Sequence, residues 1–207
     1  MRIKYPRTYH FDWSPGLQND DRRIENLDGF KGREVVISEK YDGEGTSIYL
    51  DHIHARSMDS GKHESRNWLN AFAARFQYKI PEDWRICGEN MYAKHSVFYK
   101  TLPSYFLGFS IWDSANLALS WDDTLRWFEE LGITPVKELY RGPFSMDIPW
   151  DSFVKENEWE GYVMRITDSF HYDDFHRVVA KYVRKGHVTT PAHWMTQEVV
   201  KNGLLGE

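Results

Sequence analysis

The stretch Lys40-Tyr41-Asp42-Gly43 is the part of the sequence best suited to covalent chemistry. It lies between two expected strands, so the lysine would stand at a strand end while Asp42-Gly43 turns the chain. A lysine amine attacks an electrophile only when it is neutral, and we therefore expect cationic neighbours or burial to lower the pKa of Lys40. Asp-Gly is also a common surface turn, so this motif alone does not separate a nucleophile from an ordinary hairpin.

Carboxylates and cations stand at the ends of other expected strands. Glu89 ends one strand, Glu160 begins another, and Lys181 lies in a basic strand. Residues 145–174 are rich in Asp and Glu, whereas residues 176–187 carry four Lys or Arg and no acid. Such a pair of stretches suits an enzyme that handles a metal ion and phosphates together, and it equally suits two solvated faces.

Composition bounds the class of protein. The chain has 207 residues, of which 41% are hydrophobic and 28% charged, so it can bury a core and is not disordered. One cysteine excludes a disulfide framework and a cysteine zinc site, and it fits a reducing, cytoplasmic location. Mean hydropathy is −0.64 and no apolar run is long enough for a membrane span, so we expect neither a membrane span nor a signal peptide in this sequence. The net charge of −5 argues against wholesale coating of nucleic acid.

The expected elements are mostly short strands with a few helices between them. We expect residues 1–28 to be irregular, and a hairpin to turn at Asp51-His52. Strands are expected at 34–38, 46–50, 53–56, 84–89, 105–112, 136–140, 160–166 and 177–184. Helices are expected at 64–78, at 121–131 with Ser120 as N-cap and Gly132 after the end, at 151–155, and from Pro191 to Gly203. The absence of a βαβ rhythm favours an α+β fold with mainly antiparallel sheets.

In their order along the chain, these motifs resemble those of the covalent nucleotidyltransferases, which include ATP-dependent ligases and mRNA capping enzymes. The segments that carry the resemblance are 38–47, 85–90, 105–112, 160–164 and 180–185. The run Glu89-Asn90-Met91-Tyr92-Ala93-Lys94-His95-Ser96 is most similar to the ATP-dependent RNA ligases. The resemblance implies the nucleotidyltransferase (ligase adenylation) domain, with two sheets enclosing an ATP pocket and helices at their flanks.

The resemblance also implies a role for each motif residue. Lys40 would attack the α-phosphorus of ATP and carry AMP, and Asp42-Gly43 would complete its motif. Glu39 would lie near the adenine, and Arg56 would contact phosphate or ribose, with Ser65-Arg66 as a second such contact.

Four further residues receive roles in the same way. Glu89 would contact the ribose, and Phe109 would stack on the adenine, although a strand aromatic also suits the core. Glu160 would hold Mg²⁺ or Mn²⁺, and Lys181 would neutralise the α-phosphate in the transition state.

Two departures from the family pattern bear on the alternatives. Gly45 stands where DNA ligases and capping enzymes have arginine, which weakens both of those interpretations. Lys181-Tyr182-Val183 replaces the usual Lys-x-Lys, so that Arg184 or Lys185 would supply the second cation. An inactive RNA-binding module is the alternative of another class. Retention of all the charged motif residues argues against it.

The resemblance therefore implies an RNA ligase that joins RNA 5′-phosphate and 3′-hydroxyl ends through lysyl-AMP, in RNA repair. We expect residues 1–207 to be a single adenylyltransferase domain without the C-terminal OB-fold or helical domain of many relatives. We then expect RNA to be bound by a protein partner or by basic residues near the two ends of the chain: Arg2, Lys4, Arg7, Arg177, Arg184 and Lys185.

Overall fold

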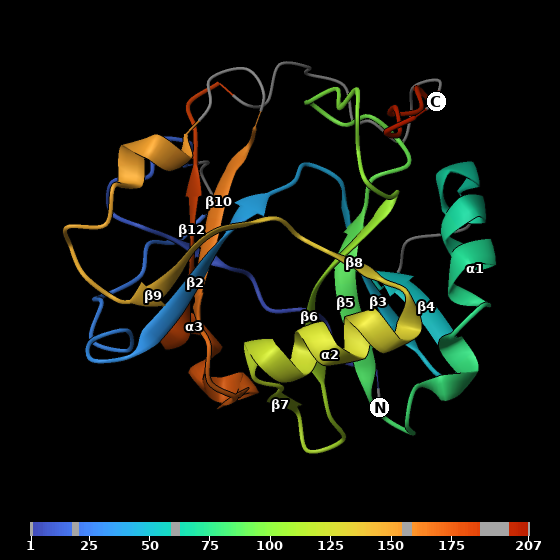
Figure 1. Cartoon of the computed structure of the whole chain (residues 1–207), viewed down its shortest axis with the longest axis horizontal. Helices are drawn as coiled ribbons and strands as arrows, with labels where there is room; N and C mark the ends of the chain where they lie inside the picture. The colour runs from blue at the N-terminus through green and yellow to red at the C-terminus, as the bar shows by residue number, and fades with distance from the viewer. Residues whose placement is uncertain (1, 18–20, 59–62, 155–158, 187–198, 207) are drawn as a thin grey trace.

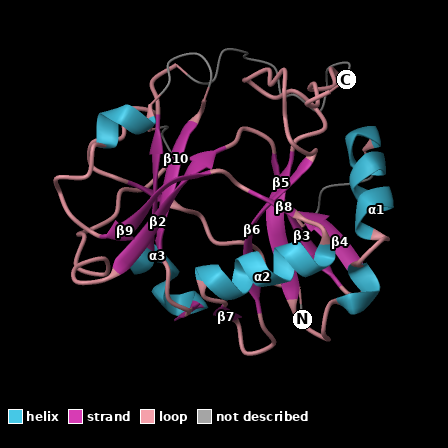
Figure 2. Cartoon of the chain, in the orientation of Figure 1, coloured by secondary structure: helices cyan, strands magenta, loops and turns pink. Residues whose placement is uncertain are grey.

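The structure is a computed structural model that describes residues 2–17, 21–58, 63–154, 159–186 and 199–206. Two β-sheets stand next to each other, and the helices lie at their flanks (Figure 1). Most of the chain outside the sheets runs in loops (Figure 2). The expected α+β fold is confirmed.

The first sheet carries the motif lysines. Its order is β1 (Tyr9–His10), β12 (Val179–Val183), β10 (Gly161–Ile166), β2 (Glu34–Lys40) and β9 (Glu138–Pro143). All pairs are antiparallel except β1 with β12.

The second sheet carries the motif carboxylate Glu89 and the aromatic Phe109. Its order is β11 (Phe170–His171), β7 (Leu117–Ala118), β6 (Phe106–Trp112), β5 (Arg85–Asn90), β3 (Glu44–Tyr49) and β4 (His52–Ala55), with β8 (Thr134–Pro135) parallel to β6.

The largest hydrophobic cluster contains residues of both sheets. Ile37 and Met164 of the first sheet share it with Cys87 and Trp112 of the second, and all four are almost fully buried. Burying one such side chain contributes about 1.5–3 kcal/mol, so this cluster is a principal reason why the two sheets stay together.

Two local predictions from the sequence are confirmed. The expected hairpin forms between β3 and β4, although Tyr49 pairs with His52, so that the turn is Leu50-Asp51, one residue before the expected Asp51-His52. The helix α2 (Trp121–Leu131) begins where the N–H of Asp123 donates to Ser120 Oγ at 3.1 Å. It ends at Gly132, whose φ of +68° is the left-handed conformation that favours glycine.

The helix expected at 64–78 is broken into three pieces. A 3₁₀ turn (Glu64–Arg66) leads into α1 (Asn67–Ala73), and a second 3₁₀ turn covers Gln77–Lys79. The backbone leaves the helical region at Phe76, with φ −135°, and the ring there is 2% exposed. The bend buries this ring against Phe72, and tertiary packing has therefore overridden helix propensity.

Other boundaries also differ from expectation. The short helix α3 (Phe175–Val178) occupies the start of the strand expected at 177–184, because Phe175 and Val178 are both buried on one side of it. The helix expected at 151–155 is a 3₁₀ turn, Trp150–Phe153. The strand expected at 136–140 is shifted to β9, and β1 lies in the segment expected to be irregular.

Residues 199–206 form an anchor, which we call the tail anchor. Most of the helix expected from Pro191 lies outside the described residues, and 199–203 is not helical. Asn202 is 1% exposed, and its side chain accepts from the Tyr99 N–H and donates to the carbonyl of Met91. A Cβ on Gly203 would lie 2.3 Å from the Lys100 oxygen, so glycine serves close approach here, not helix termination. No helix among the described residues is long and apolar enough to cross a membrane.

Candidate active site

Strand register places the two motif lysines on one face of the first sheet. Lys40 is paired with Gly161, and Lys181 is paired with Val163 two residues further along β10. Side chains two residues apart on a strand share a face. A Cβ on Gly161 would lie 1.9 Å from the Tyr182 oxygen, so only glycine permits this approach of β10 and β12.

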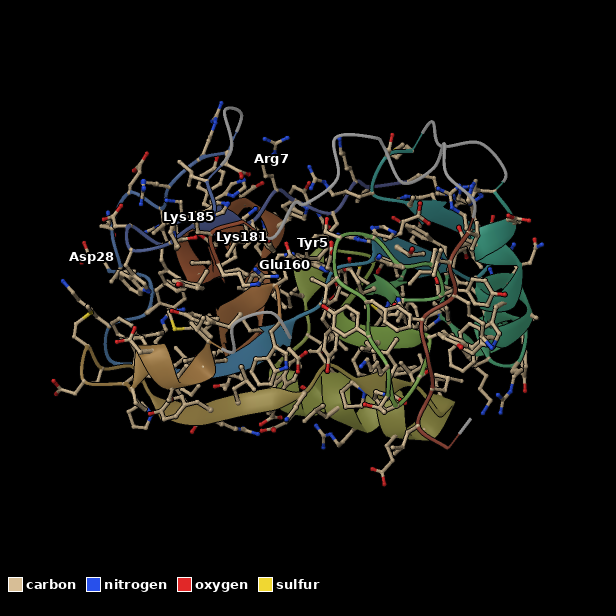
Figure 3. The ribbon with its side chains drawn as sticks, turned by 90° about the horizontal axis from the view of Figure 1, so that it is seen from above. Tyr5, Arg7, Asp28, Glu160, Lys181 and Lys185 are labelled. Carbon is tan, nitrogen blue, oxygen red and sulfur yellow. The ribbon has the colours of Figure 1, made fainter. Side chains whose placement is uncertain are left out.

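A cavity of about 890 Å³ lies over this face and extends to the second sheet. Its volume is within the range of small-molecule and cofactor sites. Figure 3 shows Glu160, Lys181 and Tyr5 near one another, with Arg7 further toward the outside. Nine residues to which the sequence assigns a role in binding or catalysis line it: Glu39, Lys40, Asp42, Gly43, Arg56, Glu89, Phe109, Glu160 and Lys181.

Lys40 and Glu160 form an ion pair within the cavity. Lys40 Nζ lies 2.5 Å from Glu160 Oε2, and Glu160 is only 6% exposed. Burial by itself would lower the pKa of Lys40, but the carboxylates of Glu160 and Glu89 outweigh burial and raise it. The expected lowering is therefore wrong for this state of the site, because the lysine has acids around it and is a protonated ammonium.

Glu89 is the second carboxylate near Lys40. Burial raises its pKa to about 8, and nearby Glu160 and Asp42 add to this, while Lys40 opposes it. The Gly43 N–H donates to its Oε1 at 3.2 Å. With a pKa of about 8, Glu89 is largely protonated at pH 7, and a cation bound nearby would favour its charged form.

These hard oxygen donors fit Mg²⁺ or Mn²⁺. Among the described residues, no three His, Cys, Asp or Glu side chains gather into a complete metal cage. A cation held by Glu160 would therefore take its remaining ligands from water and substrate phosphates, as Mg²⁺ commonly does.

Lys181 is held by residues of the N-terminal segment. Its Nζ lies 3.4 Å from Asp21 Oδ1, and the other Asp21 oxygen lies 3.0 Å from His10 Nε2. His10 Nδ1 in turn lies 2.8 Å from Ser14 Oγ. Burial and the charge of Lys40 lower the pKa of Lys181, and Asp21 opposes the shift. Asp21 and His10 were not predicted from the sequence, because neither belongs to a motif and the only local signals in their segment are turn formers.

Asp42 organises the loop that follows β5. Its Oδ2 accepts from the backbone N–H groups of Ser96 and Val97, at 2.7 and 2.8 Å, and its own N–H donates to the Tyr99 hydroxyl. These bonds bring His95 to the cavity wall. Asp42 thus ties the turn after Lys40 to a distant loop.

Phe109 and Glu39 line the cavity from opposite sheets. Phe109 is half-buried in β6, and the ring of Tyr5 meets it edge-on with centroids 5.1 Å apart. Tyr5 also lines the cavity and was missed from sequence. Glu39 is 5% exposed. Burial raises the pKa of the Tyr41 hydroxyl, and the negative charge of the Glu39 carboxylate raises it further.

The arginines differ in how they relate to the cavity. Arg56 is exposed at its rim, whereas Arg66 grips both carboxylate oxygens of Glu44 and does not line the cavity. A Cβ on Gly45 would meet only Glu89 at 3.8 Å and Arg56 at 3.9 Å, so there is space for a side chain at this position.

The residues expected to supply the second cation beside Lys181 do not reach the cavity. Arg184 Nε donates to the Trp159 carbonyl at 2.6 Å, and neither Arg184 nor Lys185 lines the cavity wall.

Comparison with known proteins gives a consistent result. The family model described as RNA ligase matches residues 33–183. No curated protein sequence matches.

Solved structures resemble the fold. An archaeal ATP-dependent RNA ligase is 15% identical with a TM-score of 0.62, over 87% of this chain and 48% of the other. A lysine-to-alanine mutant of Naegleria gruberi RNA ligase with ATP and Mn is 15% identical with a TM-score of 0.56, over 83% of this chain and 57% of the other. The chain thus spans about half the length of these ligases.

Proposed function

The chain belongs to the RNA ligase family, and from that premise we propose that it is an ATP-dependent RNA ligase that joins RNA 5′-phosphate and 3′-hydroxyl ends. The observation that carries the proposal is the single cavity lined by Lys40, Glu89, Phe109, Glu160 and Lys181. Structures of Naegleria gruberi RNA ligase with ATP and Mn, and with PPi, support a nucleotide and a divalent cation as its occupants.

In the first step the Lys40 amine attacks the α-phosphorus of ATP. An N–P bond forms to give lysyl-AMP, the P–O bond to the leaving pyrophosphate breaks, and the lysine proton leaves for solvent. A divalent cation bound to Glu160 would supply positive charge to the phosphates and draw this carboxylate away from Lys40. Loss of that contact would remove one of the causes that raise the pKa of Lys40, and the positive charge of the cation would itself favour the neutral amine.

Lys181 acts on the charge that develops at the phosphate. It shares a sheet face and the cavity wall with Lys40, which supports a role beside the pentacoordinate phosphate. In the second step an RNA 5′-phosphate oxygen attacks the same phosphorus, the N–P bond breaks and Lys40 regains a proton. In the third step a 3′-hydroxyl loses its proton to solvent and its oxygen attacks the 5′-phosphorus; a P–O bond to the 3′-oxygen forms, the P–O bond to AMP breaks and AMP leaves.

We place the reaction in RNA repair in the cytoplasm. The single cysteine, Cys87, is a free and buried thiol, which suits a reducing compartment. If this chain alone holds RNA weakly, a protein partner would supply the remaining grip.

The deciding experiment is intact mass spectrometry after incubation with ATP and Mg²⁺. We expect one added AMP, its loss when metal is omitted, and its loss again when 5′-phosphorylated RNA is added. A preference for GTP would favour a capping enzyme, and sealing of nicked DNA alone would favour a DNA ligase. RNA binding without any adduct would favour the inactive module.

A further inference from the structure

A second cavity, of about 390 Å³, adjoins the cavity of about 890 Å³ that Lys40 lines, which we call the nucleotide cavity. We call the second cavity the basic bay. The two cavities share part of their walls, including Lys4, Arg7 and Arg56. The basic bay alone adds Arg22 and His176. No Asp or Glu of the described residues lines it, although the whole chain has a net charge of −5. Such a local excess of cationic side chains fits an anionic ligand.

Aromatic rings stand among these cations. Tyr9 and His176 are stacked, with ring centroids 4.0 Å apart and planes 12° from parallel. Tyr172 lines the same bay and donates its hydroxyl proton to the Lys4 carbonyl at 2.9 Å. A cationic groove with flat rings along it is the arrangement by which proteins hold single-stranded nucleic acid, since phosphates take the cations and bases take the rings.

The N-terminal segment, which supplies much of the wall of the bay, is hydrogen-bonded to the first sheet. Tyr9 pairs with Ala180 of β12, and the chain at Arg22 returns along β1, where the His10 N–H donates to the Arg22 carbonyl at 2.8 Å. Lys4, Arg7, Tyr9 and Arg22 all precede residue 33, where the family match begins. The family match therefore assigns nothing to them.

Only two of the six basic residues expected to grip RNA line this bay. Arg2 is paired with Asp51 at 2.7 Å and Arg177 with Asp174 at 3.6 Å. Neither these two nor Arg184 and Lys185 line the basic bay.

We propose that the basic bay binds the phosphodiester backbone of the RNA strand whose 5′-phosphate enters the nucleotide cavity. The shared wall residues place the bay directly beside the cavity that Lys40 lines. The strand's nucleotides stack on the Tyr9–His176 pair. This assignment rests on the proposed function. The pyrophosphate group of ATP is the other anion that could bind in the bay. It carries no base that could stack on the rings of Tyr9 and His176.

Binding of a fluorescent 5′-phosphorylated RNA oligonucleotide, measured by anisotropy across a salt titration, tests the bay. Arg22→Ala should weaken binding several-fold and reduce the slope of log K against log salt by about 0.7, the share of one phosphate contact on a single strand. Arg22→Lys should restore most of the slope. The matched control is Arg126→Ala, an exposed arginine of α2 that pairs with Asp123. It should bind RNA as the wild type does.

Self-adenylylation separates the two phosphate sources. Arg22 does not line the nucleotide cavity, so Arg22→Ala should still gain AMP from ATP at the wild-type rate. RNA sealing by Arg22→Ala is measured beside its adenylylation. If adenylylation falls as much as sealing does, the bay binds pyrophosphate and the proposal is overturned. Unchanged RNA affinity and salt slope in Arg22→Ala, or no RNA binding by the wild type, would overturn it as well. Absence of AMP on wild-type Lys40 would instead defeat the proposed ligase activity while the RNA-binding readout stands.

Discussion

Lys40 Nζ lies 2.5 Å from Glu160 Oε2, so the proposed nucleophile and the proposed metal ligand neutralise each other. Both side chains are largely buried, and the pair is therefore stronger than one on the surface. The ammonium must lose both this partner and its proton before the nitrogen can attack. We infer that the ion pair holds Lys40 inactive until a cation competes for Glu160.

Lys40→Ala should abolish attachment of AMP, because no other amine stands at this position. Lys40→Arg should be equally inactive, since a guanidinium stays protonated in proteins. Intact mass after incubation with ATP and Mg²⁺ is the measurement. An AMP adduct on a correctly folded Lys40→Ala protein would show that the nucleophile lies elsewhere.

Glu160→Gln should slow adenylylation and raise the Mg²⁺ concentration needed for half the maximal rate. The amide keeps the shape of the side chain but loses the charge that attracts the cation. Glu160→Asp is the matched control, because it retains the charge and should lose less activity. A magnesium titration that overlays the wild-type curve would rule out Glu160 as the metal ligand.

Phe109→Ala should weaken ATP binding by about 1–3 kcal/mol, the usual contribution of stacking between a base and a ring. Phe109→Trp should bind ATP nearly as well as the wild type. Calorimetric titration with ATP gives the affinities, and thermal unfolding of the same samples reports the fold. If both variants unfold at the same lowered temperature, the ring serves the core and not the base.

Lys181→Ala should lower the rate of AMP transfer about 10²–10³-fold, the typical cost of removing one group that stabilises transition-state charge. Asp21→Asn should cause a smaller loss, because it leaves the lysine and removes only the carboxylate 3.4 Å away. Single-turnover rates with ATP are the measurement. Equal rates for Asp21→Asn and the wild type would show that Asp21 does not position Lys181.

Stability should fall in mild acid because of His10, which is fully buried. Burial and the charge of Lys181 lower its pKa from about 6.5 in the unfolded chain to about 4. The unfolded state thus takes up the proton more readily, and stability is lost as pH falls from about 6.5 toward about 4. The loss should reach about 3 kcal/mol at the lower limit.

Urea unfolding at pH 7 and at pH 5 measures this effect. His10→Gln should lose less stability between the two values than the wild type does. His52→Gln, at an exposed position on β4, is the control and should follow the wild type. Identical losses in His10→Gln and the wild type would remove His10 from the explanation.

Local sequence signals predicted the parts of the fold that depend on near neighbours. The cap at Ser120, the glycine after α2 and the β3–β4 hairpin each depend on a few adjacent residues, and all are present. The motif residues from Glu39 to Lys181 all line one cavity, as their resemblance to a known family implied. Their roles in catalysis await the experiments above.

The features of the fold and the site that could not be predicted from the sequence depend on contacts between distant segments. Phe76 ends a helical pattern only because a place in the core is available for it. Asp21 and Tyr5 become part of the site only because β1 joins β12, and no local pattern predicts a two-residue strand that pairs with one about 170 residues later. The direction of the Lys40 pKa shift likewise needed the position of Glu160.

The tail anchor bears on the order in which the protein is made. Asn202 holds Met91 and Tyr99 at the two ends of the loop whose backbone binds Asp42, next to Lys40. A ribosome adds residues in order, and a nascent chain acquires structure as it emerges. The support of this loop therefore cannot be completed until residue 202 has been synthesised. A chain stalled shortly before that point would contain every motif residue and still lack part of what holds Asp42 in place.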